Sequence, residues 1–199
     1  MVAKRISAVI IMIVVFYFTD LFAQSSFSTL QCDTELQQNG KVLMNGKLFV
    51  KGQKVRMELG SADMGDTITF SNGTSAYVYI PSQKIAMTMP ISEAQKQLPL
   101  PQNFKDSYKL TGREQVDGKE CEVYEYRDEK GNASKIWLDA QLQFPRKTIA
   151  GGVAMYYKNI VTGSEISDDY FELPAGIKTE NLAPALEAYT KGGNKENDY

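Results

Sequence analysis

Histidine is absent from the 199 residues of this chain, which removes the commonest general base and the commonest zinc ligand of proteins. The carboxylates do not replace it, because Glu125 alternates to the opposite strand face from Glu120 and Glu122. The sequence also has no phosphate-binding glycine loop, no nucleophile elbow and no metal-ligand cysteine spacing. These features predict a protein that is not an enzyme and that uses neither a cofactor nor a metal ion.

The first residues have the pattern of a secretory signal peptide. Lys4 and Arg5 precede an apolar run of 13 residues, Ile6–Phe18, and small residues follow within Ala23–Ser26. A stable transmembrane helix needs about 20 residues, so the run is too short to favour a permanent anchor. We expect residues 1–23 to be removed and the protein to be periplasmic, in solution or associated with the outer membrane. The alternative is a retained anchor.

Cys32 and Cys121 are the two cysteines of the chain. In an exported protein a cysteine pair is typical of a disulfide, and this one would close a loop of about 90 residues. Lipidation of Cys32 is disfavoured, because Ser28–Gln31 lack the small residue that such processing needs just before the cysteine. The sequence therefore predicts a Cys32–Cys121 disulfide. The alternative is a pair of buried free thiols.

Two rows of apolar residues are the candidate binding residues. Alternation along two expected strands places each row on one strand face, and the six residues are Val55, Met57, Leu59, Ile85, Met87 and Met89. Flexible methionine side chains suit a pocket that accepts variable apolar ligands. The alternative is that these residues fill an ordinary core.

The remaining sequence favours one β-rich domain. The formal net charge of −2 and the lack of a clustered basic face argue against a nucleic-acid partner, and we expect a monomer. Period-2 alternation, broken by turn pairs such as Asn39-Gly40, predicts an antiparallel sheet, and Asn45-Gly46 predicts a bulge or a further turn. The expected strands are 30–36, 41–50, 54–59, 66–70, 75–80, 84–89, 107–115, 120–127, 134–138, 145–150 and 153–160. Short helices are expected at 91–98 and 182–191.

Six segments occur in a recognisable order: Asn45–Lys51, Lys54–Glu58, Ser71–Pro81, Trp137–Asp139, Phe144–Arg146 and Asp168–Ile177. Their order and spacing resemble the periplasmic lipoprotein carrier superfamily, and within it the exported relatives described as outer-membrane lipoprotein-sorting-like. The last segment is similar to the closing strand of that superfamily. The resemblance covers roughly residues 27–178, so we expect a carrier-like domain at 24–178 and a C-terminal helix with a polar tail at 179–199.

The resemblance implies a mainly β (α+β) fold, a strongly curved antiparallel sheet that forms an unclosed half-barrel with one or two helices on its concave face. It also implies an apolar cavity that holds a lipid or a lipoprotein acyl chain and carries it toward the outer membrane. The cysteine pair departs from the superfamily pattern. Its lid arginine has no clear counterpart, since Arg56 alternates away from Val55 and Met57. The alternative function is an envelope protein-interaction or sensing module without lipid.

Overall fold

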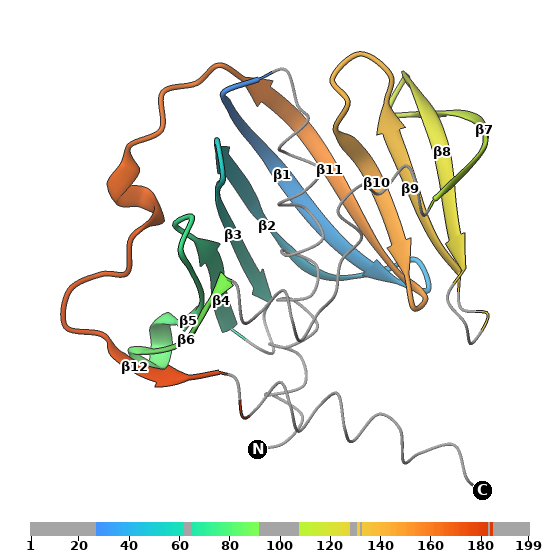
Figure 1. Ribbon diagram of the computed structural model, residues 1–199. Helices are drawn as coiled ribbons and strands as arrows, with labels where there is room; N and C mark the ends of the chain where they lie inside the picture. Colours follow the sequence, from blue (N-terminus) through green and yellow to red (C-terminus); the bar gives the residue numbers. More distant parts are fainter. Residues whose placement is uncertain are drawn as a thin grey trace, which may run out of the picture.

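The computed structural model describes residues 27–61, 65–91, 108–127, 131, 133–182 and 184, most of which belong to one β-sheet (Figure 1). Its strands are β1 (Thr29–Gln38), β2 (Lys41–Lys51), β3 (Lys54–Ser61), β4 (Gly65–Ser71), β5 (Ser75–Ile80), β6 (Ile85–Pro90), β7 (Lys109–Val116), β8 (Lys119–Arg127), β9 (Ala133–Asp139), β10 (Pro145–Ala150), β11 (Val153–Thr162) and β12 (Lys178–Asn181). Two short 3-10 helices accompany them, η1 (Pro81–Gln83) and η2 (Asp168–Phe171).

The strands form one open sheet in the order β12-β6-β5-β4-β3-β2-β1-β11-β10-β9-β8-β7. Strands β1 to β6 make one antiparallel meander, β7 to β11 make a second, and antiparallel pairing of β1 with β11 joins the two. The sheet is strongly curved, and its end strands β12 and β7 are not paired with each other (Figure 1). The expected mainly β, unclosed sheet is confirmed for the described residues.

Alternating burial accompanies the alternating sequence. In β1, every second side chain from Leu30 to Leu36 is buried, and the side chains between them are partly exposed. The turn that follows uses Asn39 (φ 51°) and Gly40 (φ 76°), and Asn-Gly is the preferred pair for a two-residue hairpin turn with two positive φ angles. All strands expected between residues 30 and 160 are present, with ends that differ by a few residues.

One local expectation within the first meander is wrong. Asn45-Gly46 makes neither a turn nor a bulge but lies inside β2, and the irregularity in the β1–β2 pairing falls at Leu36–Gln37. A Cβ atom on Gly46 would overlap the carbonyl oxygen of Glu58 on β3. Glycine is therefore required here because the backbones of β2 and β3 approach each other closely, and not because the chain turns.

The closing strand expected within Asp168–Ile177 is also wrong. Residues 163–177 contain η2 and irregular chain, and the last strand, β12, follows them. We call residues 163–177 the strap. It runs along the outside of the curved sheet from the end of β11 to β12, which pairs in parallel with β6 (Figure 1). The strap thus leads the chain from β11 at the centre of the sheet to β12 at the edge, beside β6.

Several expectations fall outside the described residues. The expected signal peptide, at residues 1–23, lies wholly outside them, and the helices expected at 91–98 and 182–191 lie almost wholly outside them. Signal cleavage and helices on the concave face therefore remain predictions. Within the part of the chain that the structure describes, no helix is long and apolar enough to cross a membrane.

Candidate functional site

The candidate residues on β3 lie in the middle of a buried apolar face. Val55, Met57 and Leu59 alternate along the strand and are 0%, 0% and 2% exposed. We call the sheet face that carries them the inner face. Buried side chains from β1, β2 and β11, and one from the connection between β9 and β10, join them in one cluster, namely Leu30, Cys32, Leu36, Met44, Leu48, Val50, Phe144, Met155 and Tyr157. The sheet register thus continues the predicted row across several strands.

The candidate residues on β6 lie on the same inner face, three strands away. One row of cross-strand partners runs through Met57, Thr69, Val78 and Met87. Strands lie about 4.8 Å apart, so the two predicted rows are roughly 14 Å apart across β4 and β5. Met89 is 1% exposed, whereas Ile85 and Met87 are half-buried. The structure therefore brings all six candidates to one face, but β4 and β5 separate them into two groups.

The inner face is uncharged along these rows. A further row joins Val55 on β3 to Ser71, Ala76 and Met89, and it contains no ionisable group. Along β3 to β6 these rows offer apolar contact and a few hydroxyl groups, but no ionisable side chain. Sequence reasoning missed its β1, β2 and β5 members, although their alternation was visible, because the register between strands was not.

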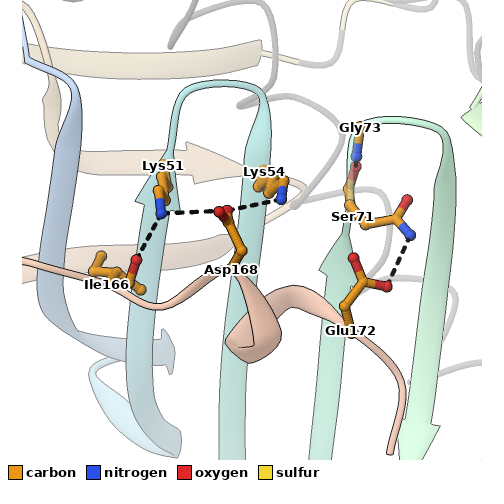
Figure 2. Close-up of polar contacts among 8 residues, drawn as sticks. Lys51, Lys54, Ser71, Gly73, Ile166, Asp168 and Glu172 are labelled. Atoms are coloured by element: carbon orange, nitrogen blue, oxygen red, sulfur yellow. Dashed lines mark hydrogen bonds and ion pairs between the residues drawn. The ribbon is translucent and has the colours of Figure 1, made fainter.

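The outer face of β2 to β4 is covered by the strap. Asp168 Oδ1 lies 2.8 Å from Lys54 Nζ and 3.2 Å from Lys51 Nζ (Figure 2). Lys51 Nζ also donates to the carbonyl oxygen of Ile166 at 2.8 Å. Lys54, and then Lys51, lower the pKa of the Asp168 carboxyl. These ion pairs are exposed, so they position the strap more than they stabilise it.

Arg56 fastens the centre of the strap. Its Nη1 donates to the carbonyl oxygen of Tyr170 at 2.9 Å, and its Nε donates to Glu58 at 2.7 Å. The Tyr170 hydroxyl also donates to Glu58, at 2.8 Å, and the Tyr170 ring packs edge-on against Phe49. Arg56 therefore lies on the outer face, as alternation predicted, and its guanidinium group holds the strap instead of covering an inner cavity.

The predicted disulfide is wrong. Cys32 on β1 and Cys121 on β8 are both buried free thiols. Strands β11, β10 and β9 lie between β1 and β8, which places the two strands about 19 Å apart across the sheet, whereas a disulfide needs Cα atoms within about 7 Å. Burial raises the pKa of both thiols and so disfavours the reactive thiolate. Export of the protein would favour a disulfide, but the sequence alone does not show whether the two cysteines lie close together.

The acidic residues that the sequence singled out are held in ion pairs. Arg113 lies 3.3 Å from Glu120 and 3.7 Å from Glu122, and Glu125 lies 3.2 Å from Lys135. Among the described residues, no group of three or more His, Cys, Asp or Glu is arranged to hold a metal ion. These three carboxylates therefore contribute ion pairs that link β8 to β7 and β9.

Fold and site together define a class of protein: an open, curved β-sheet whose inner face is uncharged along the rows of β3 to β6 and whose outer face is crossed by a strap. The sequence signature of the family described as domain of unknown function (DUF4412) matches residues 30–144, more than half of the chain. The chain belongs to this family. Among curated proteins, none matches the sequence.

Solved structures share the fold at low sequence identity. An uncharacterized conserved protein from Thermus thermophilus is 8% identical, with a TM-score of 0.61 over 85% of this chain and 96% of its own. A chain of the Pseudomonas aeruginosa MucA/MucB complex is 16% identical, with a TM-score of 0.50 over 81% of this chain and 60% of its own. PNGF-II is 11% identical, with a TM-score of 0.50 over 82% of this chain and 33% of its own. At these identities the likeness shows the fold alone.

Proposed function

We propose that this protein is a non-catalytic carrier in the periplasm whose inner face holds an apolar ligand, a lipid or the acyl chain of a lipoprotein, on its way to the outer membrane. The observation that supports it is that the rows joining β3 to β6 on the inner face are uncharged and carry the candidate residues of both strands. Four methionines on this face, Met44, Met57, Met89 and Met155, are at most 3% exposed. Their flexible thioethers can repack around ligands of different shape.

Elementary energetics favour such binding without covalent chemistry. Each methylene group that leaves water for an apolar surface contributes roughly 0.8 kcal/mol, so a long acyl chain needs no charged partner. The strap occupies the outer face, which leaves the inner face for a ligand. The inner-face side chains are buried in this structure. Binding of the ligand would therefore replace some of their contacts within the protein by contacts with the ligand. The half-buried Ile85 and Met87 lie at its margin and would meet the ligand first.

Lipid extraction tests the proposal directly. Protein purified from the envelope is extracted with organic solvent, the extract is analysed by mass spectrometry, and delipidated protein is titrated with a fluorescent fatty acid. Met87→Glu should weaken uptake at least about tenfold, because a carboxylate on an apolar face must be desolvated. Thr88→Glu is the matched control, since Thr88 is the next residue on β6 and alternates to the outer face. Wild-type protein that carries no lipid and takes up none would contradict the carrier function.

A second candidate is an envelope protein-interaction or sensing module with no lipid cargo. The MucA/MucB complex favours it, because a chain with this fold is found there with a protein partner. In that case the inner face is a packed core, and Met87→Glu lowers stability only. Lipid-free protein that ignores the fatty acid but retains one stoichiometric envelope protein through purification would support this module over the carrier.

A further inference from the structure

Among the described residues, two threonine hydroxyl groups on the inner face are buried without a hydrogen-bond partner. They are Thr69 Oγ1 on β4 and Thr34 Oγ1 on β1. Thr69 is 1% exposed and Thr34 is 3% exposed. Both belong to the face that carries the candidate residues, because Thr69 is paired with Met57 on β3 and Thr34 is paired with Gly46 on β2.

Two other hydroxyl groups among the described residues do have partners. Ser71, on the same strand and face as Thr69, accepts a hydrogen bond from the backbone N–H of Gly73 at 3.3 Å. Thr111 donates to the carbonyl oxygen of Val123 at 3.1 Å. A buried hydroxyl without a partner is unfavourable, and valine would fill the same volume in a strand without that cost. The two inner-face hydroxyl groups therefore need a partner that the described part of the chain does not supply.

Water is a poor partner at Thr69. The cross-strand neighbours of Thr69 are Met57 and Val78, which are 0% and 1% exposed and offer water no strong hydrogen bond. A buried water molecule typically needs two to four polar partners. An oxygen atom attached to an apolar molecule suits this position better, because the rest of that molecule can contact the apolar neighbours.

We propose that the ligand of the inner face is an acyl lipid with an ester or amide carbonyl, and that this carbonyl accepts a hydrogen bond from the Thr69 hydroxyl. The Thr34 hydroxyl donates to a second oxygen atom of the lipid. Strand spacing places the two threonines roughly 15 Å apart, which is too far for both to bind the same oxygen atom. The inference rests on the proposed carrier function and makes it specific: Thr69 selects carbonyl-bearing lipids over plain hydrocarbon chains of the same length.

The test uses two probes that differ in the carbonyl alone, a dodecanoyl glycerol ester and the dodecyl glycerol ether. Wild-type protein should bind the ester about fivefold to tenfold more tightly than the ether, the value of one hydrogen bond. Thr69→Val should bind both probes equally, and Thr69→Ser, which keeps the hydroxyl, should restore the preference. Thr88→Val, on the outer face of β6, should behave as wild type.

Stability supplies an independent readout. Without ligand, Thr69→Val and Thr34→Val should each raise the melting temperature, because each removes a buried hydroxyl that has no partner. If wild-type protein binds neither probe, the carrier function and this inference both fail. If wild-type protein and Thr69→Val bind both probes alike, the carrier function stands and the Thr69 contact is overturned. Thr69→Val that melts below wild type would likewise contradict it, since that result means the hydroxyl already has a partner in the chain.

Discussion

Asp139 holds the turn between β9 and β10 through three hydrogen bonds. Its Oδ1 accepts from the backbone N–H groups of Gln141 and Leu142, at 2.8 and 2.9 Å, and its Oδ2 accepts from Arg146 Nε at 2.7 Å. Asp139 is 3% exposed and Arg146 is 8% exposed. A buried charge that loses its partner is expensive, so this ion pair matters more than the exposed pairs of the sheet.

Asp139→Asn should lower the free energy of unfolding by about 3 kcal/mol, because it keeps an oxygen for the turn but leaves the Arg146 charge buried and unpaired. Urea unfolding followed by tryptophan fluorescence measures the change. Asp169→Asn, at an exposed position, is the control and should stay within about 0.5 kcal/mol of wild type. An equally small change for Asp139→Asn would mean that water reaches Arg146.

Between pH 2 and pH 8, stability should depend on pH mainly in acid. Among the described residues, five carboxyl groups have a lowered pKa, namely Asp33, Glu35, Glu125, Asp139 and Asp168. At Asp139 burial raises the pKa, but hydrogen bonds from Leu142, Arg146 and Gln141 outweigh it. A folded pKa below the unfolded value means that stability is complete above about pH 5 and is lost as the pH falls through the folded values. The chain has no histidine to add a transition near neutrality.

Thermal unfolding between pH 2 and pH 8 checks this expectation. The melting temperature should be nearly constant from pH 6 to pH 8 and should fall steadily below about pH 4. Asp139→Asn should flatten part of the acid decline, because it removes one of the titrating groups. A steep change between pH 6 and pH 8 would contradict the assignment of the decline to carboxyl groups.

For individual residues, the sequence predicts which apolar side chains are buried better than it predicts which polar groups are bonded. Val55, Met57 and Met89 are buried on one face, as alternation indicates. The cysteines are not bonded, because pairing depends on which strands are neighbours. Thr69 was not a candidate, since a threonine in a strand is explained by its β propensity alone. Its missing hydrogen-bond partner becomes visible only when all surrounding atoms are in place.

The strap is the least regular element of the described structure. Individual side chains, more than backbone pairing, hold it against the sheet. Phe171 is 0% exposed, and Tyr170 lies between Phe49 and the guanidinium group of Arg56. The strap delivers β12 to β6, so these contacts also protect one edge of the sheet. A short parallel strand of four exposed residues has little stability of its own. We therefore expect the strap to open locally before the rest of the sheet unfolds.

Tyr170→Ala should release the strap, because it removes the ring contact with Phe49, the stacking under Arg56 and the hydrogen bond to Glu58. The expected loss is about 2 to 3 kcal/mol. Hydrogen exchange should become faster in β12 and β6, and limited proteolysis should cut within residues 163–177. Asp169→Ala is the neighbouring control and should do neither. Unchanged exchange in β12 would show that the remaining contacts of the strap, among them buried Phe171 and the Asp168 ion pairs, hold it without the Tyr170 side chain.

The elements differ in how well the sequence predicts them. Most strands between residues 30 and 160 are predicted because apolar and polar residues alternate along them and because several are separated by turns that contain Gly. β12 escapes prediction because all four of its side chains are exposed, so its sequence has no apolar period. The segment at 168–177 resembles a strand in its apolar residues, but Asp168 and Asp169 begin a short 3-10 helix, and the aromatic residues dock on the outer face instead.

Across the whole molecule, the pairing of β1 with β11 decides the architecture. Glu35 lies opposite Tyr156, and Lys158 Nζ lies 3.1 Å from Glu35 across the seam between the two meanders. Alternation specifies which side chains share a face but not which distant strand will pair, because every antiparallel partner satisfies the same period. The resemblance to the carrier superfamily predicted an open, curved sheet. The pairing of β1 with β11 could not be predicted from the sequence.

Both ends of the described sheet carry features that prevent edge-to-edge pairing. In β7, every side chain from Lys109 to Gln115 is exposed, and Arg113 is 65% exposed beside Glu120. The other end is the four-residue β12, whose side chains are all exposed. Charged residues and very short strands are the usual means of keeping sheet edges apart. They are consistent with the expected monomer, and they predict what happens when the charges are removed.

Lys109→Val combined with Arg113→Val should make the protein self-associate, because it turns β7 into an apolar edge with unpaired backbone groups. Sedimentation velocity should show dimers or larger species that grow with concentration, while wild-type protein stays monomeric. Lys47→Val with Lys158→Val removes the same charge from the middle of the sheet and should remain monomeric, which separates an edge effect from a change in net charge. A double edge variant that stays monomeric would mean that something other than these charges keeps β7 from pairing.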